Sequence, residues 1–324
     1  MRSDDSAIRL ANTHAFGLTD VGRKREINQD QFLIAELNKS MLVSSTSLPL
    51  HQQSRLFGSG QGQLFLVADG MGGHAAGEKA SSLAVDDLVS QLLNSVHWFF
   101  QIEHDCEDDF IDDLKDLLRN THRRILSESS SNIEQHGMGT TLTMAHVVWP
   151  RLYVVHAGDS RCYLIRNGEC QQLTTDHTLA RKLVESGGLR PEDEATSRWS
   201  NVLWNVLGGQ NEDGELIAEV RRADLQEGDA LLLCSDGLYR YLDCPSLAAA
   251  VNSSADLPTI CRRLIDAANE AGGDDNITVI VAKPSPTKSD EQVTLPNDRR
   301  DTRGLGKVGR DAVAEDDTDD TLPG

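Results

Sequence analysis

The sequence lacks an excess of positive charge, and it lacks any long uncharged apolar run. Its 31 basic residues stand against 51 acidic residues, which gives a formal net charge of −20. A charge of this sign repels the phosphates of nucleic acids and of anionic membranes, so neither is expected as a partner. No uncharged run approaches the roughly 18 residues of a membrane span, and residues 1–20 lack the apolar core of a signal peptide. We therefore expect a soluble, cytoplasmic protein.

The sequence also lacks any C-x-x-C pair, although it contains six cysteines. Cys162 and Cys234 lie inside apolar, strand-like runs, which is typical of buried thiols. Reduced and buried cysteines are therefore expected. A disulfide framework or a zinc site is the less favoured alternative.

Large aliphatic residues nearly vanish after Lys283, while Pro and Gly recur and residues 315–320 form an acidic run. Such a segment cannot bury enough apolar surface to offset the entropy lost on ordering. The expected organisation is a flexible start at residues 1–10, one folded domain over 11–283 and a disordered acidic tail over 284–324.

Apolar patterning predicts a mixture of strands and helices in the folded part. Asn167-Gly168 is a favoured two-residue hairpin turn, since both residues tolerate positive φ. Helical periodicity covers residues 77–93 and 108–126. Antiparallel sheet flanked by two long helices predicts an α+β domain. The expected strands lie within 30–37, 64–68, 141–148, 151–157, 162–173, 229–235 and 276–282.

Two longer segments interrupt this pattern. Residues 37–63 connect the first two strands, and we expect an extended hairpin with a mobile tip there. Residues 178–209 hold a short helix, a Gly-Gly break and a Trp-bearing stretch, and they are expected to form an excursion outside the sheet.

The stretch LFLVADGMGGHAAGEKA, residues 64–80, has the strand–turn–helix pattern of a ligand site. Its glycines match G-x-G-x-x-[GA], the dinucleotide-binding pattern. However, Asp69 would place a carboxylate beside the pyrophosphate, and the following strands are joined as hairpins rather than by helices. A phosphate-binding P-loop is excluded as well, because Glu78 follows Gly77 where that motif needs Lys.

Four aspartates favour a metal site instead. Asp69 and Asp236 each end an apolar strand, while Asp30 and Asp275 each open one. Strand ends and starts are neighbours in an antiparallel sheet, so the four carboxylates can meet on one rim. Their mutual repulsion calls for cations, and oxygen ligands suit Mg²⁺ or Mn²⁺. Each aspartate alone could be an ordinary Asp-Gly turn or cap, but that explanation does not suit all four. A glycine after the aspartate lets backbone approach closely, so the Gly70 carbonyl is a further candidate ligand.

Seven motifs occur in the order and approximate spacing of the metal-dependent serine/threonine protein phosphatases, the PPM or type 2C family. The chain most resembles the bacterial members, and the resemblance spans Thr19 to Val281. The motifs are GRKREINQDQF, VADGMGGHAAGE, GMGTTLT, HAGDSRCYLIRNGE, LTTDHT, LCSDGL and GGDDNITVIV.

The resemblance implies a sandwich of two antiparallel sheets with a pair of helices outside each, in four αββα layers. It also implies a dinuclear Mn²⁺ or Mg²⁺ centre at one end. In the family, the residue matching Asp69 bridges both ions, and the Gly70 carbonyl, Asp236 and Asp275 complete the ligand shells. The residue matching Asp30 acts mostly through bound water.

Three further features follow from the same resemblance. Arg25 matches an arginine that grips the phosphoryl group, for which a planar guanidinium is well suited. Asp159, together with Asp236, matches a third and weaker ion site of bacterial members. Residues 178–209 match a mobile flap above it.

The chain departs from the family pattern at two positions. Gln29 stands where many members have Glu, which removes a charge next to metal-bound water. Met71 stands where animal members have a His that serves as leaving-group acid. His74 and His177 are nearby candidates for that acid, but a structural role is favoured for each, and a metal-bound water could serve instead.

The function implied is hydrolysis of phosphoserine and phosphothreonine on proteins, with substrates supplied by serine/threonine kinases and with the enzyme as a monomer. Two ions about 3.5–4 Å apart share a water, lower its pKa and aim it at phosphorus. Two alternatives remain: a dimetal hydrolase of small phosphoesters, and a catalytically silent phosphoprotein-binding regulator. A Cys234 nucleophile is disfavoured because its apolar strand offers no cation to stabilise a thiolate.

Overall fold

The computed structural model describes residues 13–42, 55–73, 76–94, 107–209, 215–253 and 255–284. These ranges all fall in one compact unit, Met1–Thr287. The predicted flexible start and the predicted acidic tail, apart from Pro284, lie outside the described residues and stay predictions.

The described strands form two antiparallel sheets, one of five strands and one of seven. The five-stranded sheet has the order β1 (Thr13–Asp20), β12 (Ile277–Pro284), β11 (Ala230–Cys234), β7 (Arg161–Arg166) and β8 (Glu169–Gln172). The seven-stranded sheet has the order β10 (Glu219–Asp224), β6 (Arg151–Ala157), β5 (Leu142–Val148), β3 (Arg55–Met71), β4 (Gly139–Thr140) and β9 (Leu207–Gly208), and β2 (Asp30–Leu42) also pairs with β3.

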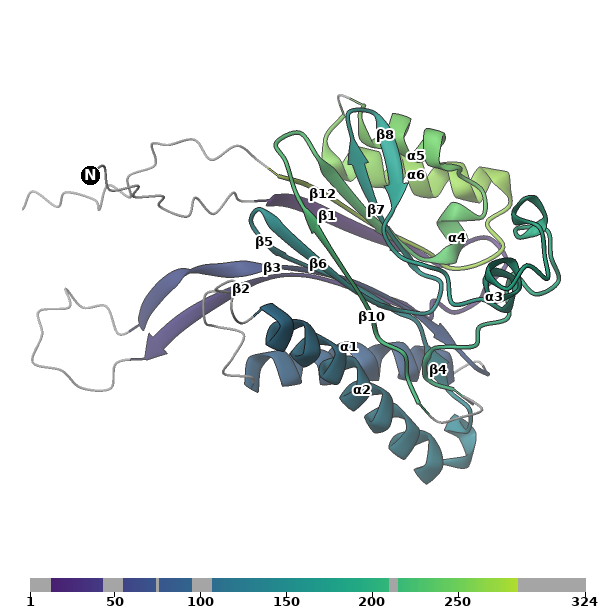
Figure 1. Ribbon diagram of the computed structural model, residues 1–324, viewed down its shortest axis with the longest axis horizontal. Helices are drawn as coiled ribbons and strands as arrows, with labels where there is room; N and C mark the ends of the chain where they lie inside the picture. Colours follow the sequence, from purple (N-terminus) through teal and green to yellow (C-terminus); the bar gives the residue numbers. More distant parts are fainter. Residues whose placement is uncertain are drawn as a thin grey trace, which may run out of the picture. The chain divides into compact units, whose positions relative to one another are not determined.

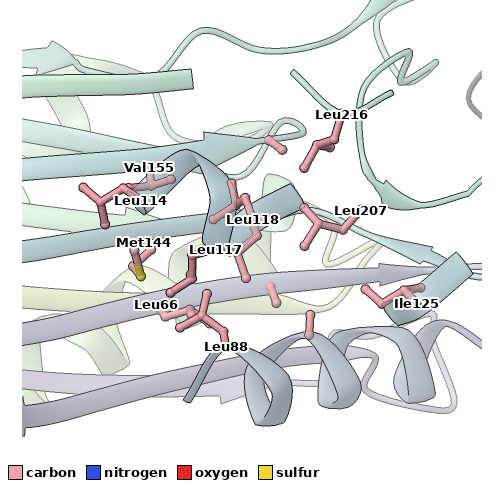
Figure 2. Packing of buried hydrophobic residues seen from close by; sticks show 14 of the residues in the cluster. Leu66, Leu88, Leu114, Leu117, Leu118, Ile125, Met144, Val155, Leu207 and Leu216 are labelled. Atoms are coloured by element: carbon pink, nitrogen blue, oxygen red, sulfur yellow. The ribbon is translucent and has the colours of Figure 1, made fainter. Parts of the chain in front are cut away.

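Two long helices, α1 (Ala76–Asn94) and α2 (Glu107–Ser131), cover the outer face of the seven-stranded sheet (Figure 1). Both predicted apolar stripes point inward, so the helical periodicity read from the sequence is confirmed. Leu88 of α1 and Leu114 of α2 are fully buried against Leu66 and Met144 of the sheet (Figure 2). Apolar burial of this kind is the main force that holds an amphipathic helix on a sheet.

The five-stranded sheet is covered by α5 (Cys244–Val251) and α6 (Leu257–Ala271), and α4 (Asp236–Tyr239) leads into them (Figure 1). Asp243 and Asp256 cap α5 and α6 by accepting hydrogen bonds from backbone N–H groups of the first turn, at 3.0 and 2.9 Å. The sequence analysis did not single out these helices, although both carry an N-cap aspartate and an early proline.

A third apolar cluster fills the space between the two sheets. Phe65 and Val154 of the seven-stranded sheet meet Leu231 and Ile280 of the five-stranded sheet there. The order from one side to the other is therefore helices, sheet, sheet and helices, with an apolar core at each of the three junctions. The α+β class and the four-layer αββα sandwich are confirmed.

Several predicted strands extend further than their apolar runs. β2 and β3 pair as a long antiparallel hairpin out to Leu42 and Arg55, as expected for the connection at 37–63. The predicted mobile tip falls at 43–54, outside the described residues. The Asn167-Gly168 hairpin turn joins β7 to β8, with φ values of 53° and 86°.

The segment 178–209 leaves the sheet as predicted but returns earlier. It contains α3 (Leu179–Glu185) and the short 3-10 helix η4 (Pro191–Asp193), and Leu207–Gly208 already pairs with β4 as β9. We use "flap" for residues 179–206. Leu203, near the end of the flap, forms a β-bridge with Thr178, which directly precedes the flap, and the mobility of the flap stays a prediction.

Across the part of the chain that is described, no helix combines the length and the apolar character needed to cross a membrane.

Candidate metal and phosphate site

Asp30 and Asp69 are direct cross-strand partners at one end of the seven-stranded sheet. The backbone of Asp69 is held by the neighbouring segment: its N–H donates to Thr141 Oγ1 at 3.0 Å, and its carbonyl accepts from Thr141 N and Thr140 Oγ1 at 2.9 Å each. Strand pairing and these hydrogen bonds together fix the position of the Asp69 backbone, from which the carboxylate extends.

Asp236 and Asp275 come from the other sheet. Asp236 follows β11 through Ser235, and Asp275 precedes β12, which is the antiparallel neighbour of β11. The strand argument of the sequence analysis considered neighbouring strands of an antiparallel sheet, whereas the four aspartates are divided between the two sheets of the sandwich. The rims of the two sheets meet at this end, which agrees with the centre at one end of a sandwich that the resemblance implies.

Asp30 connects the two sheets. Its Oδ2 accepts hydrogen bonds from Ser235 Oγ and Thr278 Oγ1, both at 2.7 Å. Ser235 Oγ in turn accepts from the Thr278 N–H at 2.9 Å. Thr278 belongs to β12 and Ser235 directly follows β11, whereas Asp30 belongs to β2, so these hydrogen bonds join the rims of the two sheets at the site.

The acidic side chains lie close enough to perturb one another strongly. Burial, followed by the charges of the other four acids, raises the pKa of Asp69 well above its ordinary range. Burial also raises the pKa of Asp30 to about 7, that of Asp236 to about 6 and that of Asp159 to about 8. Asp159 therefore joins the four acids singled out by strand position. A cluster of this kind disfavours its own ionised state unless positive charge is supplied.

Two carboxylate oxygens of the cluster lack hydrogen-bond partners. Asp30 Oδ1 and Asp236 Oδ1 are buried, and neither contacts a donor within the described residues. A buried, unpaired carboxylate oxygen is costly, so such atoms usually face an ion or ordered water. All-oxygen donors with free lone pairs fit Mg²⁺ or Mn²⁺, and the predicted ligand residues fit such ions.

Glycine after each strand-ending aspartate is required by packing. A Cβ on Gly70 would lie 2.1 Å from the Gly77 carbonyl oxygen, and one on Gly237 would lie 2.1 Å from the Asn276 carbonyl oxygen. These contacts explain the two Asp-Gly pairs without a ligand. The role of the Gly70 carbonyl as a metal ligand therefore stays a prediction.

Two arginines bring positive charge to the cluster. Arg25 Nη2 donates to Asp275 Oδ2 at 2.7 Å, and the Arg25 side chain is about half exposed. This hydrogen bond, together with the charges of Asp69 and Asp236, raises the pKa of Arg25. Arg240 forms an ion pair with Asp236 one helical turn away, a contact that the sequence analysis missed. The i, i+4 spacing within SDGLYR was the available signal.

Asn276 and Tyr239 are further residues that the sequence analysis did not single out. Asn276 Nδ2 donates to the carbonyls of Val21 and Ile27 at 2.9 and 3.0 Å, so it anchors the loop that carries Arg25. Tyr239 donates to Asp159 Oδ2 at 3.3 Å. The guanidinium of Arg161 stacks on the Tyr239 ring at 3.5 Å and is itself held by Asp176. The stack thus holds the tyrosine ring whose hydroxyl donates to Asp159.

The histidine candidates lie differently. His74 lies outside the described residues. His177 is buried, and its Nδ1 accepts from the Gly158 N–H at 3.1 Å and faces the Asn205 amide at 2.9 Å. Its Nε2 faces Glu219 Oε2 at 3.5 Å, so both ring nitrogens are engaged within the fold, which supports a structural role for His177. The Gln29 side-chain amide packs against Gly77, because a Cβ added to Gly77 would lie only 2.5 Å from Gln29 Nε2.

A second cluster consists of His156, His177 and Glu219, whose potential ligand atoms lie within 4.8 Å of one another. The aspartates do not form such a tight group within the described residues. We favour the aspartates nevertheless, because ligands shared between two hydrated ions are spread more widely than those of one ion. The histidine nitrogens are also already occupied: His156 bonds Thr143 at 2.8 Å and Thr175 at 3.0 Å.

Cys234 is fully buried, and burial raises its pKa far above the ordinary thiol range. A protonated, inaccessible thiol is a poor nucleophile. This geometry supports a site that works without a cysteine.

Comparison with known proteins agrees with this geometry. The family described as "Protein phosphatase 2C" matches residues 50–280. The serine/threonine phosphatase stp of Listeria monocytogenes is 30% identical over 275 residues, which are 85% of this chain and 97% of that protein. The solved serine/threonine phosphatase of S. agalactiae has 30% identity and a TM-score of 0.68, covering 85% of this chain and all of that one.

A further solved structure is the catalytic domain of the phosphatase PstP in complex with two manganese ions. It has 29% identity and a TM-score of 0.63, and covers 84% of this chain and 97% of that one. The family match over most of the chain and the relative at 30% identity show that the chain belongs to the protein phosphatase 2C family.

Proposed function

We propose that this chain hydrolyses phosphoserine and phosphothreonine monoesters on proteins with the help of two divalent cations, Mn²⁺ or Mg²⁺. The observation that carries the proposal is a cluster of acids whose charges interact: Asp30, Asp159 and Asp236 are buried and Asp69 is half-buried. Asp30 and Asp236 each keep an unpaired carboxylate oxygen, and the half-exposed Arg25 lies beside the cluster. The family membership and the manganese complex of PstP support the same assignment.

In this proposal Asp69 and Asp236 hold the ions together with Asp275, and Asp30 orients their water ligands. When bound, such a pair of ions lowers the pKa of a water molecule and draws charge from the phosphoryl oxygens. The protein's own part is to keep the carboxylates in place, through Thr141 for Asp69 and through Ser235 for Asp30. Arg25, on the exposed side of the cluster, orients the phosphoryl group.

The proposal is tested by measuring hydrolysis of an aryl phosphate and of a phosphothreonine peptide with Mn²⁺, with Mg²⁺ and with chelator. We expect turnover only with metal, and we expect thiol alkylation to leave it intact. Undiminished turnover in chelator would contradict the proposal. Turnover of small phosphoesters but not of phosphopeptides or phosphoproteins would favour the dimetal hydrolase of small substrates. Metal binding without any turnover would favour the silent regulator, although the retention of every predicted aspartate ligand speaks against it.

Arg25→Ala is expected to raise KM about 10-fold or more and to change kcat less. Charge-assisted hydrogen bonds contribute about 1.5–3 kcal/mol, and about 1.4 kcal/mol corresponds to a factor of ten. A group that holds ground state and transition state alike acts mainly on KM. Steady-state kinetics with a phosphopeptide measures this.

Lys24→Ala is the matched control, since Lys24 precedes Arg25 but pairs with the exposed Asp274 at 2.5 Å. Its kinetics should stay close to those of the unchanged protein. An Arg25→Ala variant with unchanged KM and collapsed kcat would show that the arginine acts only in the transition state.

The finer expectations stay part of this proposal. We expect that the substrates are products of serine/threonine kinases, and that the protein acts in signalling, in the cytoplasm and as a monomer. We also expect a third ion between Asp159 and Asp236, beneath the flap. The third ion is supported by the electrostatic coupling of these two carboxylates.

A further inference from the structure

Cys170 and Cys244 form a thiol pair that the sequence analysis did not foresee. Cys170 lies in β8, at the edge of the five-stranded sheet, and Cys244 is the first residue of α5. Their sulfur atoms are 2.9 Å apart although 74 positions separate the residues. Both are free cysteines and both are partly exposed. The expectation of buried cysteines was therefore wrong for these two.

The other described cysteines differ from this pair in their exposure. Cys162, Cys234 and Cys261 are fully buried, so reagents in water do not reach them. The sulfur of Cys261 faces the Phe16 carbonyl at 3.5 Å rather than another thiol. Partial exposure together with a neighbouring sulfur is, among the described residues, particular to Cys170 and Cys244.

The sulfur positions are close to those of a disulfide. A disulfide bond is about 2.05 Å long, so the two sulfur atoms need to approach by only about 0.9 Å. The side chains already point at each other from two segments that pack together, β8 and the start of α5. Bond formation therefore needs little movement of the backbone.

We propose that Cys170 and Cys244 are an oxidation site, which a hydroperoxide converts reversibly into a disulfide linking β8 to α5. The expected redox partners are peroxides as oxidants and small thiols as reductants. The modification is separate from the aspartate cluster, and it does not depend on the proposed phosphatase function.

The reaction proceeds in two balanced steps. The thiolate sulfur of Cys244 attacks one oxygen of hydrogen peroxide, the O–O bond breaks, and hydroxide leaves and takes up the thiol proton as water. The sulfur of Cys170 then attacks the sulfenic acid sulfur of Cys244, the S–O bond breaks, and a second water leaves. Two thiols are thereby oxidised and one peroxide is reduced to two waters.

The order of the two cysteines follows from their surroundings. Cys244 is the first residue of α5, where the positive end of the helix dipole favours a negatively charged sulfur, whereas Cys170 lies in a strand. Burial also raises the pKa of Cys170. We therefore assign the first attack to Cys244 and the second to Cys170. Cys170→Ser should then leave a sulfenic acid on Cys244 that a dimedone-type reagent traps, whereas Cys244→Ser should yield much less trapped product on Cys170.

The test treats the full-length protein with hydrogen peroxide and follows it by peptide mass spectrometry and thermal unfolding. We expect a peptide pair linked through Cys170 and Cys244, lighter by two hydrogens. We also expect a rise in Tm on the order of 5–10 °C that dithiothreitol reverses, because the bond closes a long loop. Cys170→Ser and Cys244→Ser should each lose both effects.

Cys261→Ser is the matched control, because it removes a cysteine that is buried away from the pair. It should keep the linked peptide and the Tm rise. Cys106 lies outside the described residues, and Cys106→Ser shows whether that thiol competes for the bond. The proposal is overturned if the oxidised, folded protein contains no Cys170–Cys244 link, or if the Tm rise persists in both serine variants of the pair.

Discussion

Asp69→Asn is expected to lower kcat/KM by about 10³-fold or more while the protein stays folded. Asparagine keeps the size and one oxygen of the side chain but removes the charge at the centre of the cluster, where the other four acids surround it. If Asp69 holds the ions as proposed, losing them removes several kcal/mol of transition-state stabilisation, and about 1.4 kcal/mol corresponds to a factor of ten. Phosphopeptide turnover over a series of Mn²⁺ concentrations measures the effect.

The matched control for this variant is Asp116→Asn. Asp116 pairs with Arg119 on the exposed face of α2, and its side chain is 63% exposed. This substitution removes the same charge far from the cluster, so turnover should remain close to that of the unchanged protein. If Asp69→Asn stayed within tenfold of the unchanged enzyme at every Mn²⁺ concentration, Asp69 would not be a metal ligand.

The metal-free protein is expected to lose stability as pH rises from about 4 to about 8. Asp30, Asp236 and Asp159 have folded-state pKa values of about 7, 6 and 8, above the ordinary value of 3.8. The folded state therefore binds more protons than the unfolded state within this window. The stability that these three carboxyl groups contribute is fully present below their unfolded-state pKa and is lost as the pH rises through their folded-state pKa values. Thermal unfolding in chelator, at a series of pH values, measures it.

Adding Mn²⁺ should reverse this trend. A cation that binds only the folded, ionised cluster raises Tm, and it does so more at pH 8 than at pH 5. Asp69→Asn should make the metal-free Tm less dependent on pH, because one source of repulsion is gone, and it should weaken the rise with Mn²⁺. A metal-free Tm that increases steadily between pH 5 and pH 8 would show that the carboxylates are not forced together in the folded state.

These two results have a common origin in the arrangement of the acids. Burial and mutual repulsion make the ionised state of the carboxylates unfavourable without metal, and the same features make the carboxylates strong ligands for divalent cations. Activity and pH-dependent stability should therefore change together in variants of Asp30, Asp69 and Asp236. A substitution that lowered activity but kept both the pH dependence of stability and the Mn²⁺ effect on Tm would change binding of the phosphoryl group rather than of the ions. This is the result expected for Arg25.

Local patterning was sufficient for much of the fold. The stripes of α1 and α2 and the apolar runs of β6 and β11 are visible in the sequence, because burial on one face imposes a period on residues close in the chain. β10 was missed because its sequence, EVRRAD, is largely polar along an edge strand. α5 was missed because CPSLAAAV is short and almost uniformly apolar.

The site could be predicted as a set of residues but not as an arrangement. Strand ends and the family motifs pointed to Asp30, Asp69, Asp236 and Asp275, but strand ends alone did not show that these residues are divided between two sheets. The sandwich brings the rims of two sheets together, and Asp30 bonds across to Ser235 and Thr278. Sequence spacing carries no information on such contacts, because the residues are 205 and 248 positions away from Asp30.

The sequence by itself determined the elements, the family resemblance and the identity of the acidic residues, since these depend on local periodicity and on motifs. Only the tertiary structure decided that Asp30 bonds to Ser235 and Thr278, that Asn276 anchors the loop of Arg25, and that Cys170 meets Cys244. The physical reason is that packing two sheets and their helices brings distant segments within hydrogen-bonding distance. Which side chains then meet depends on how each layer is placed against the next.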